Sequence, residues 1–443
     1  MTSAIGIDFG TTNTVVALVD AAGRVATVRF STEGTSEGGC RSVLAIGVDE
    51  DDPRASLLID IGPWAIQRYL AGPEECRLIQ SPKSHLGSRA FQETRIFGRT
   101  VRLEQLVGWF LSALLERGRL EGGAAVVEPG AFRVAAGRPV TFWGTKPDDA
   151  LAMARLRAGY AMTDITDPRF VYEPVGASFY AASQLTRDAT VLVADLGGGT
   201  TDYSVIRYGI RDDGSLTITP LAHRGIGIGG DRFDFRIVQK AVAPMLGKGT
   251  TYRSFGGQFD IPVAYFNRVG NWHEFTFLRT PEVLRDLKLI ARNAEAPERV
   301  DRLVRLVDGN LGFHLNQRIA EAKAALSSTE AVILSLDDLG VDLTVSLERS
   351  AFESWIAEDL AALSGVLDAT LAEAEATAGG EVEIDVAFLT GGSSLVPAVR
   401  RLFEARLGAN RIQAGEEFQS VAKGLALIAA LPDASAWTID GRA

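Results

Sequence analysis

Two segments of the chain share one pattern of apolar and polar positions. Residues 5–20 read IGIDFGTTNTVVALVD and residues 191–207 read VLVADLGGGTTDYSVIR. Each has an apolar run, a turn of glycine and threonine, and a second apolar run, which predicts a two-stranded hairpin whose glycines supply the backbone angles of the turn. The first turn reads as one residue shorter. The distance between the segments is too long for a solenoid repeat and predicts a duplicated domain.

Helical periodicity dominates between and after these hairpins. In LEQLVGWFLSALLERG (103–118), apolar residues recur at intervals of three and four, which predicts a helix with a buried face. Ser350 and Glu353 have the spacing of a capping box at the start of one long predicted helix. Residues 132–144 predict a strand and a loop, and 383–408 a strand, a Gly-Gly-Ser turn and a helix. Further helices are predicted at 147–162, at 172–185 after a Glu-Pro turn, and at 231–246, 282–291, 319–328, 349–376 and 421–431.

Composition narrows the class of protein. With 443 residues and 46% hydrophobic content, the chain predicts two to three domains with sizeable cores. The net charge is −11 and the charges are dispersed, so we expect protein or small-molecule partners and no nucleic acid. Cys40 and Cys76 have no metal-ligand spacing, and their expected role is that of small core residues. The chain shows neither a signal peptide nor a membrane span, so we expect a cytoplasmic protein with no membrane partner.

The two turns favour phosphate chemistry. Glycine backbone N–H groups approach phosphate oxygens without steric obstruction, and threonine hydroxyls add donors. Asp8 and Asp195, each at the end of an apolar run, are hard oxygen ligands suited to Mg²⁺ or its water shell. The pair of hairpins therefore predicts a polyphosphate and its metal held between them. The alternative is that DLGGGTTD is only a hairpin with glycine at special backbone angles.

Other phosphate and metal motifs are absent or weak. No G-x-x-x-x-G-K-[ST] occurs, which excludes a P-loop of that type. The run GIGIGG at 225–230 matches G-x-G-x-x-G, but no acidic residue follows about 20 positions later, which disfavours a dinucleotide dehydrogenase. The four histidines, His85, His223, His273 and His314, show no metal-ligand spacing. We expect them to be structural or solvated.

The motifs DFGTTNT, EPVGAS, DLGGGTTD, GIGGDRFD, AKAALSS and TGGSSLVP, in this order, resemble the ATPase domain of the heat-shock-seventy (DnaK-like) chaperones. The resemblance covers roughly residues 4–430 and is strongest to YegD-like members that lack the peptide-binding domain. It implies an α/β fold, the two-lobed actin-like ATPase with a duplicated ribonuclease H-like core. Lobe I would span 1–187 with an insertion at about 33–105, and lobe II 188–443 with an insertion at about 232–331.

The resemblance also implies a set of functional residues and the cofactors ATP or ADP with Mg²⁺. Asp8 and Asp195 would hold the metal through water, and Lys83 matches the catalytic lysine. Glu173, Thr200 and Asp202 match groups near the metal or the attacking water. The residues implied to contact the nucleotide are Gly10, Thr11, Thr12, Asn13, Gly197, Gly198, Gly199, Thr200, Thr201, Gly229, Gly230, Asp231, Lys323, Ser327, Gly391, Gly392 and Ser393.

Each of the three charged assignments has a plainer alternative. Lys83 could be a surface lysine, Glu173 a helix-entry cap, and Asp202 an acid in a turn at a strand end. These alternatives stay open at the level of sequence.

The chain also departs from the family pattern. Ala324 follows Lys323 where the family commonly has an arginine that stacks on adenine, and Leu395 stands where the adenosine turn often has another arginine. Phe418 and Gln419 precede the last helix in place of an acidic pair. The sequence ends about ten residues after the last predicted helix. We therefore expect differently packed adenine, altered coupling between lobes and no peptide gripping through a β-sandwich.

The function implied is that of a slowly hydrolysing, DnaK-like regulatory ATPase. Closure of its lobes on Mg·ATP would signal the nucleotide state to a protein partner or co-chaperone. Three alternatives remain: a non-hydrolysing ATP-gated binding module, an actin-like filament protein, and a small-molecule kinase of the same superfamily.

Overall fold

The computed structural model describes residues 4–439 except for 21, 33–34, 49–56, 73–74, 120–131, 145, 166, 184, 186, 212–215, 272–273 and 415–418. The chain forms two compact units. Unit 1 contains Met1–Gly230, Leu363–Ser394 and Arg401–Ala443, and unit 2 contains Asp231–Ala362 and Leu395–Arg400. The lobe boundary at 187/188 and the bounds of the insertions stay predictions.

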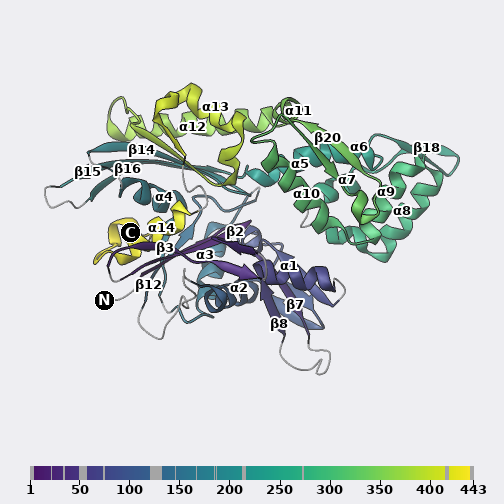
Figure 1. The fold of residues 1–443 in the computed structure, drawn as a ribbon, viewed down its shortest axis with the longest axis horizontal. Helices are drawn as coiled ribbons and strands as arrows, with labels where there is room; N and C mark the ends of the chain where they lie inside the picture. The colour runs from purple at the N-terminus through teal and green to yellow at the C-terminus, as the bar shows by residue number, and fades with distance from the viewer. Residues whose placement is uncertain are drawn as a thin grey trace. The chain divides into compact units, whose positions relative to one another are not determined.

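The first core sheet of unit 1 has the strand order β13-β12-β1-β2-β3 (Figure 1). Strand β1 pairs in parallel with β12, which pairs in parallel with β13, whereas β1–β2 and β2–β3 are antiparallel. A short strand, β6, also pairs with β2. The strands are β1 (Ala4–Phe9), β2 (Asn13–Val19), β3 (Val25–Thr27), β6 (Cys40–Arg41), β12 (Arg133–Arg138) and β13 (Arg169–Tyr172).

The second core sheet repeats this arrangement with the order β16-β15-β14-β21-β22. Here β14–β15 and β15–β16 are antiparallel, whereas β14–β21 and β21–β22 are parallel. Both sheets thus have the order third, second, first, fourth, fifth strand with the same directions. This repetition agrees with the predicted fold class, the duplicated α/β core of an actin-like ATPase. The strands are β14 (Ala189–Leu196), β15 (Thr201–Ile210), β16 (Leu216–Ile226), β21 (Val386–Thr390) and β22 (Ile412–Ala414).

Both predicted hairpins are confirmed, but their turns have equal length. In the first ladder Asp8 lies opposite Val15 and Phe9 closes on Thr14. In the second, Asp195 lies opposite Asp202 and Leu196 closes on Thr201. Four residues separate the closing pair in each hairpin, so the expectation of a shorter first turn is wrong. The pairing of the strands, and not the position of the threonines, sets which residues of the two turns correspond.

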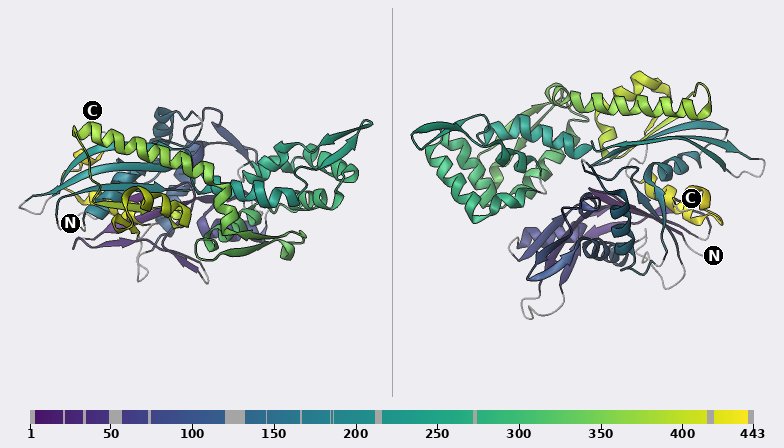
Figure 2. Two further views of the ribbon diagram at one scale, coloured as in Figure 1. Left: turned by 90° about the horizontal axis from the view of Figure 1, so that it is seen from above. Right: turned by 180° about the vertical axis from the view of Figure 1, so that it is seen from behind.

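Two helices join the sheets into one core. Helix α4 (Glu173–Ala182) and helix α14 (Ser420–Ala430) bury side chains in the same apolar cluster as strands of both sheets. In Figures 1 and 2 both helices lie between the two sheets. A Cβ on Gly424 would overlap the backbone of Gly176, so small residues are required where α4 and α14 cross. The helix expected at 172–185 thus forms over Glu173–Ala182, with its Glu-Pro pair inside the first turn.

The first sheet is covered on its other face by α2 (Leu103–Arg117) and α3 (Asp149–Tyr160). The apolar stripe predicted for 103–118 is buried, which confirms that helix. The remaining elements of unit 1 before β12 are short. They are β4 (Phe30–Thr32), β5 (Thr35–Glu37), β7 (Val43–Gly47), β8 (Leu58–Ile61), α1 (Gly62–Ala71), β9 (Cys76–Gln80), η1 (Pro82–His85), β10 (Glu93–Ile96) and β11 (Arg99–Arg102).

Unit 2 is mainly helical, with two small hairpins. The predicted helix at 231–246 forms as three consecutive pieces, the middle one a π-helical turn. The elements are α5 (Gly230–Ile237), η2 (Val238–Val242), α6 (Ala243–Met245), β17 (Thr251–Ser254), β18 (Gly257–Asp260), α7 (Val263–Gly270), η3 (Phe275–Arg279), α8 (Pro281–Asn293), α9 (Pro297–Asp308), α10 (Gly312–Ala325), β19 (Ala331–Ser335), η4 (Asp337–Leu339), β20 (Thr344–Glu348) and α11 (Arg349–Trp355).

The single long helix predicted for 349–376 is wrong in two respects. It forms as α11 and α12 (Ala357–Ala378), separated at the fully buried Ile356. The expected capping box is also absent, because β20 continues to Glu348 and the helix begins directly after it. Ser350 therefore lies inside the helix, beyond the capping position. The chain continues with η5 (Gly392–Leu395), α13 (Pro397–Leu407), η6 (Ala409–Arg411) and η7 (Ser435–Trp437).

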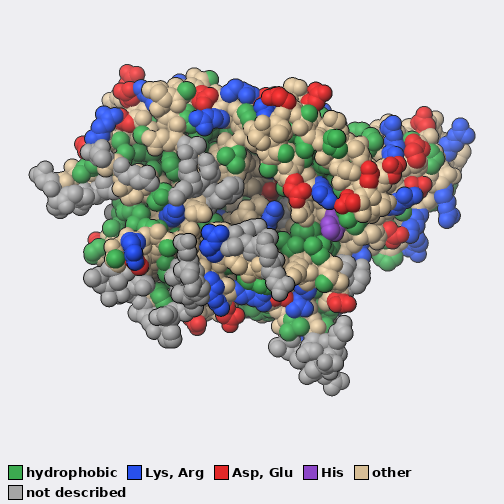
Figure 3. Space-filling view, in the orientation of Figure 1, with side chains coloured by type: hydrophobic (Ala, Val, Ile, Leu, Met, Phe, Trp, Pro, Cys, Tyr) green, Lys and Arg blue, Asp and Glu red, His purple; other side chains and the backbone are tan. Residues whose placement is uncertain are grey.

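The apolar length of the helices and the distribution of surface charge bear on the expectations from sequence. No helix among the described residues is long and apolar enough to cross a membrane. On the face drawn in Figure 3, acidic and basic side chains are interspersed over both units.

Candidate functional site

The two hairpin turns line one cavity of unit 1, with a volume of about 100 Å³. Lys83 from η1, Glu173 from the first turn of α4, and the glycine turn after β21 complete the lining. The cavity thus gathers most of the residues that the sequence singled out. Its lining residues are Asp8, Gly10, Thr11, Thr12, Asn13, Val15, Lys83, Glu173, Asp195, Gly197, Gly198, Gly199, Thr200, Thr390, Gly391, Gly392 and Val421.

Lys83 and Glu173 form a buried ion pair. The Lys83 ammonium donates to Glu173 Oε1 at 2.6 Å, and each side chain is only 7% exposed. The surface interpretation of Lys83 is therefore wrong. Glu173 does lie at the entry of α4, but its carboxylate is engaged by Lys83. A buried lysine held by a buried carboxylate keeps its charge inside the protein, where it can act on an anion.

Negative charge exceeds positive charge in this part of the structure. Asp8, Glu173 and Asp195 line the cavity, and Lys83 is the single cation among the described lining residues. Burial raises the pKa of Asp8 well above its usual value, and the charges of Glu173 and Asp195 raise it further while Lys83 opposes. Burial, with Glu173 and then Asp202, raises the pKa of Asp195 to about 8. A divalent cation would supply the missing positive charge.

The pKa of Lys83 is also raised, which for a lysine favours the charged form. Its burial by itself lowers the pKa of the ammonium, but the carboxylates of Glu173 and Asp8 outweigh this effect, and the pKa of Lys83 is raised. The lysine is therefore charged at neutral pH.

Asp202 lies next to the cavity and connects the two sheets. Its carboxylate accepts hydrogen bonds from the backbone N–H of Val140 at 3.1 Å and of Thr141 at 3.4 Å, in the loop after β12. The hydroxyl of Thr200, which lines the cavity, donates to it at 3.1 Å. Burial, and next the charge of Glu173, raise the pKa of Asp202 to about 7, although these hydrogen bonds act to lower it. Asp202 lies within β15, one residue past the turn, and its part in catalysis stays a prediction.

Two serines that the sequence analysis missed hold the first turn. The Ser42 hydroxyl donates to the Gly10 carbonyl at 2.7 Å and lies 2.9 Å from the Thr14 hydroxyl oxygen. The Ser81 hydroxyl donates to the Thr11 carbonyl at 2.5 Å. Ser81 has φ 46°, an unusual left-handed conformation just before Lys83. No local pattern could have revealed these contacts, which span 28 to 70 residues of sequence.

Several predicted glycines lie where a side chain would collide. Gly391 has φ 82°, and a Cβ there would overlap the carbonyl oxygen of Leu196. A Cβ on Gly229 would overlap the carbonyls of Gly197 and Gly198, although Gly229 does not line the cavity. The Gly230 N–H donates to the Gly197 carbonyl at 3.0 Å. These glycines bring three backbone segments together at the second turn.

Two further predicted residues support the second turn from outside the cavity. Ser393 is buried, and its hydroxyl donates to the Gly197 carbonyl at 3.3 Å. Thr201 donates to the Ile228 carbonyl at 2.8 Å. Both hydroxyls are therefore engaged with backbone, and any contact of theirs with nucleotide stays a prediction.

The remaining predicted residues belong to unit 2. Lys323 donates to Asp234 at 2.9 Å, and with Asp231 and Ser327 its role in nucleotide binding stays a prediction. Leu395, in place of an expected arginine, is 46% exposed. Phe418, which replaces an expected acid, and His273 lie outside the described residues. In the described part of the chain, no group of three or more His, Cys, Asp or Glu side chains is arranged to hold a metal directly.

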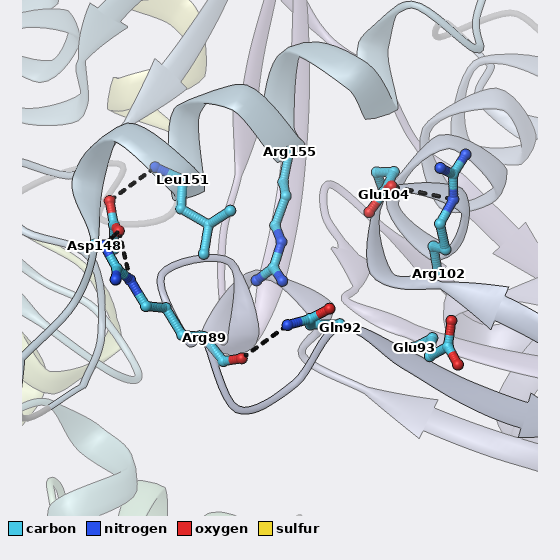
Figure 4. Close-up of a pocket in the computed structure, with 8 residues that line it drawn as sticks. All are labelled: Arg89, Gln92, Glu93, Arg102, Glu104, Asp148, Leu151 and Arg155. Atoms are coloured by element: carbon cyan, nitrogen blue, oxygen red, sulfur yellow. Dashed lines mark hydrogen bonds and ion pairs between the residues drawn. The ribbon is translucent and has the colours of Figure 1, made fainter.

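A larger cavity of about 550 Å³ lies elsewhere in unit 1, next to the β10–β11 hairpin. Its arginines already have protein partners: Figure 4 shows Arg89 bonded to Asp148 and Arg102 to Glu104. Arg155 donates to four backbone carbonyls, those of His85, Leu86, Ser88 and Phe91. This cavity therefore offers little unengaged charge to a phosphate group.

Comparison with known proteins identifies relatives of the chain. The Hsp70 protein family matches residues 305–436. The chaperone protein DnaK of Deinococcus deserti is 24% identical over 449 residues, which covers 97% of this chain and 60% of the relative. The chaperone protein DnaK of Deinococcus radiodurans is 24% identical over 459 residues with the same coverage. The chain thus spans about 60% of the length of these relatives.

Proposed function

We propose that the chain, which is similar to Hsp70 and DnaK proteins, binds ATP with Mg²⁺ in the unit 1 cavity and hydrolyses it slowly. The observation that carries this proposal is the convergence of two matching glycine turns, one buried lysine and three carboxylates on one space. Backbone donors, a buried cation and metal-binding carboxylates around one space suit a triphosphate. Membership of a YegD-like subgroup and a cytoplasmic location stay predictions.

The residues fit the metal as well as the phosphates. Asp8 and Asp195 would hold Mg²⁺ through its water shell, since their buried charges repel each other and are short of a cation. When bound, the metal would neutralise phosphate charge. Gly10, Thr11 and Gly198 are among the turn residues whose N–H and hydroxyl groups would bind the phosphate oxygens.

The chain's own groups can then orient and deprotonate water. Phosphoryl transfer requires mainly positioning and charge stabilisation. Lys83 would offset the charge that spreads over the transferred phosphoryl group. Water would attack the γ-phosphorus, its bond to the bridging oxygen would break, and ADP and phosphate would form. The water's proton would pass to the Thr200 hydroxyl while the proton of that hydroxyl passes to Asp202, whose pKa near 7 suits a base.

The output of this cycle would be a conformational signal. We infer that closure around ATP and opening after hydrolysis report the nucleotide state to a protein partner or co-chaperone. Both core sheets provide cavity residues, and Asp202 ties the loop after β12 to β15. A change of charge at the cavity therefore acts on both sheets at once. DnaK-like relatives support a chaperone-type role in this broad sense.

Two measurements test the proposal. Isothermal titration with ATP and ADP should show binding that strengthens with Mg²⁺, and the absence of binding would refute the nucleotide site. Single-turnover hydrolysis should fall by about 100-fold or more in Lys83→Ala, because a charge aimed at the transition state is lost. Lys146→Ala, which removes an exposed lysine of the same unit, should keep the wild-type rate.

The outcomes separate the alternatives. Equal rates in Lys83→Ala and wild type would remove Lys83 from the chemistry. Tight binding without phosphate release would leave a non-hydrolysing module. Transfer of the γ-phosphate to a small molecule would indicate a kinase instead.

A further inference from the structure

A groove in unit 2, which has no part in the proposed function, runs between helix α10 and strand β19. It encloses about 470 Å³. Figure 1 labels α10 and β20, the partner strand of β19. The lining residues are Arg318, Glu321, Ala322, Ala325, Val332, Ile333, Leu334, Ser335 and Asp338.

Within the described part of the chain, one edge of β19 has no strand beside it. Among the described strands, β19 pairs only with β20. The hydrogen bonds from Leu336 N to Leu343 O and from Arg349 N to Glu330 O bracket this ladder. Because antiparallel ladders alternate, the backbone groups of Ala331, Ile333 and Ser335 point away from β20. An edge of this kind is a template for an additional strand.

The groove also has an apolar floor and room for side chains. Ile333 is 70% exposed, whereas its neighbour Leu334 is only 2% exposed. Opposite the strand, α10 contributes the small side chains of Ala322 and Ala325. A helix and a free strand edge with small residues between them form the type of groove that accepts an extended peptide.

The charges around the groove select the occupant. Residues 330–348 include five acids, Glu330, Asp337, Asp338, Asp342 and Glu348, and no lysine or arginine. Three of these acids have arginine partners: Asp338 pairs with Arg318, Glu330 with Arg349 and Asp342 with Arg302. The remaining lining acid, Glu321, lies 3.8 Å from Arg318. With these three arginines counted, the hairpin and the groove still have an excess of negative charge. A second copy of the hairpin would bring acid against acid, which is unfavourable. A basic partner would instead be attracted.

We propose that this groove binds an extended segment of a partner protein, with alternating apolar and basic residues, as a third strand beside β19. The backbone of the segment would bond to Ala331, Ile333 and Ser335. Its apolar side chains would face Ala322 and Ala325, and its basic side chains would face the acids of the hairpin. The proposal stands independently of ATP binding.

A synthetic peptide tests the chemistry. The probe is fluorescein-labelled Lys-Val-Lys-Val-Lys-Val-Lys, amidated at its C-terminus and titrated with the full chain in an anisotropy assay. It should bind at least ten-fold more tightly than the matching Glu-Val peptide, and more weakly as salt is raised. Equal binding of the two peptides, or no binding of the lysine peptide, would overturn the proposal.

A pair of proline variants tests the edge. Ile333→Pro removes an N–H that points into the groove, and Ser346→Pro removes its cross-strand counterpart, which points away from β19. Neither change deletes a bond of the β19–β20 ladder. Peptide affinity should fall at least ten-fold in Ile333→Pro and stay within two-fold in Ser346→Pro.

A larger side chain in the groove provides a second test, which leaves the backbone hydrogen-bonding groups of β19 unchanged. Ala325→Leu should also weaken the peptide, with circular dichroism and thermal melting as checks on folding. Equal affinity of all three variants would refute the site. Self-association of the chain, seen by sedimentation and lost in Ile333→Pro, would assign the groove to a second copy and overturn the basic partner.

Discussion

Asp195→Asn should stabilise the ligand-free protein while it removes the response to Mg·ATP. The pKa of Asp195 is about 8 in the folded chain, against an ordinary value of 3.8. At neutral pH, unfolding therefore releases a proton from this group. Below pH 3.8 the Asp195 carboxyl is neutral in both the folded and the unfolded chain, and the folded protein keeps its full stability. As the pH rises from 3.8 toward 8, the unfolded chain loses this proton more readily than the folded chain, and the free energy of unfolding falls. Asparagine carries no charge and escapes this loss.

The size of the effect follows from the pKa. One pH unit of such a difference corresponds to about 1.36 kcal/mol. Between pH 3.8 and pH 7 the charge of Asp195 lowers the free energy of unfolding by about 4 kcal/mol, and at pH 4.5 it has lowered it by about 1 kcal/mol. The gain in Asp195→Asn should follow the same pH dependence. At pH 7 it corresponds to a rise of roughly 4 °C in melting temperature for a chain of this length.

The assay is thermal unfolding by circular dichroism at pH 4.5 and pH 7, in EDTA and without nucleotide. Asp167→Asn, which changes an exposed aspartate of the same unit, should leave both melting temperatures unchanged. A second scan with Mg·ATP at pH 7 should raise the melting temperature of the wild type and not that of Asp195→Asn. Destabilisation by Asp195→Asn, or a gain equal at both pH values, would refute the reasoning.

Three further substitutions probe the site. Ser42→Ala should lower the free energy of unfolding by about 1–3 kcal/mol and weaken ATP binding, as measured by denaturation and titration, since it removes the hydrogen bonds of Ser42 with the Gly10 carbonyl and with the buried Thr14 hydroxyl. Unchanged ATP affinity would contradict a positioning role. Gly391→Ala should cost at least about 1 kcal/mol in denaturation because its φ is 82°, and unchanged stability would argue against the strained turn. Glu173→Gln should lower the pKa of Lys83 by removing its counter-charge. As the pH is raised, the hydrolysis rate of this variant should therefore begin to decline at a lower pH than that of the wild type. An unshifted pH profile would show that the charge of Lys83 does not control the rate.

Much of the core could be predicted because its signals are local. The apolar runs that flank 8–14 and 195–202 form the expected strands, and the stripe in 103–118 forms the expected buried helix face. Alternation and helical periodicity depend on near neighbours in the chain. The errors arose where tertiary structure decides a boundary. The start of α11 depends on where β20 ends, and the pairing of strands sets the turn lengths.

The same division between local signals and tertiary contacts applies to the residues of the candidate site. The acids and glycines of the turns were identified from their own motifs. Ser42 and Ser81 were missed because their partners lie 28 to 70 residues away, and neither belongs to a recognised pattern. The exposed edge of β19 was also invisible in the sequence, since an apolar run reads alike whether its edge is paired or free.

The amino-acid order by itself determined two strand-turn-strand units with an acid at the end of each first strand, because those features need only short-range preferences. Only the tertiary structure decided that Lys83 meets Glu173 across 90 residues and that Asp202 binds the loop after β12. Packing of both sheets on α4 and α14 brings these groups within Coulomb range and excludes water from them. The raised pKa values of Asp8, Asp195 and Asp202 result from that enclosure, which the chain acquires only on folding.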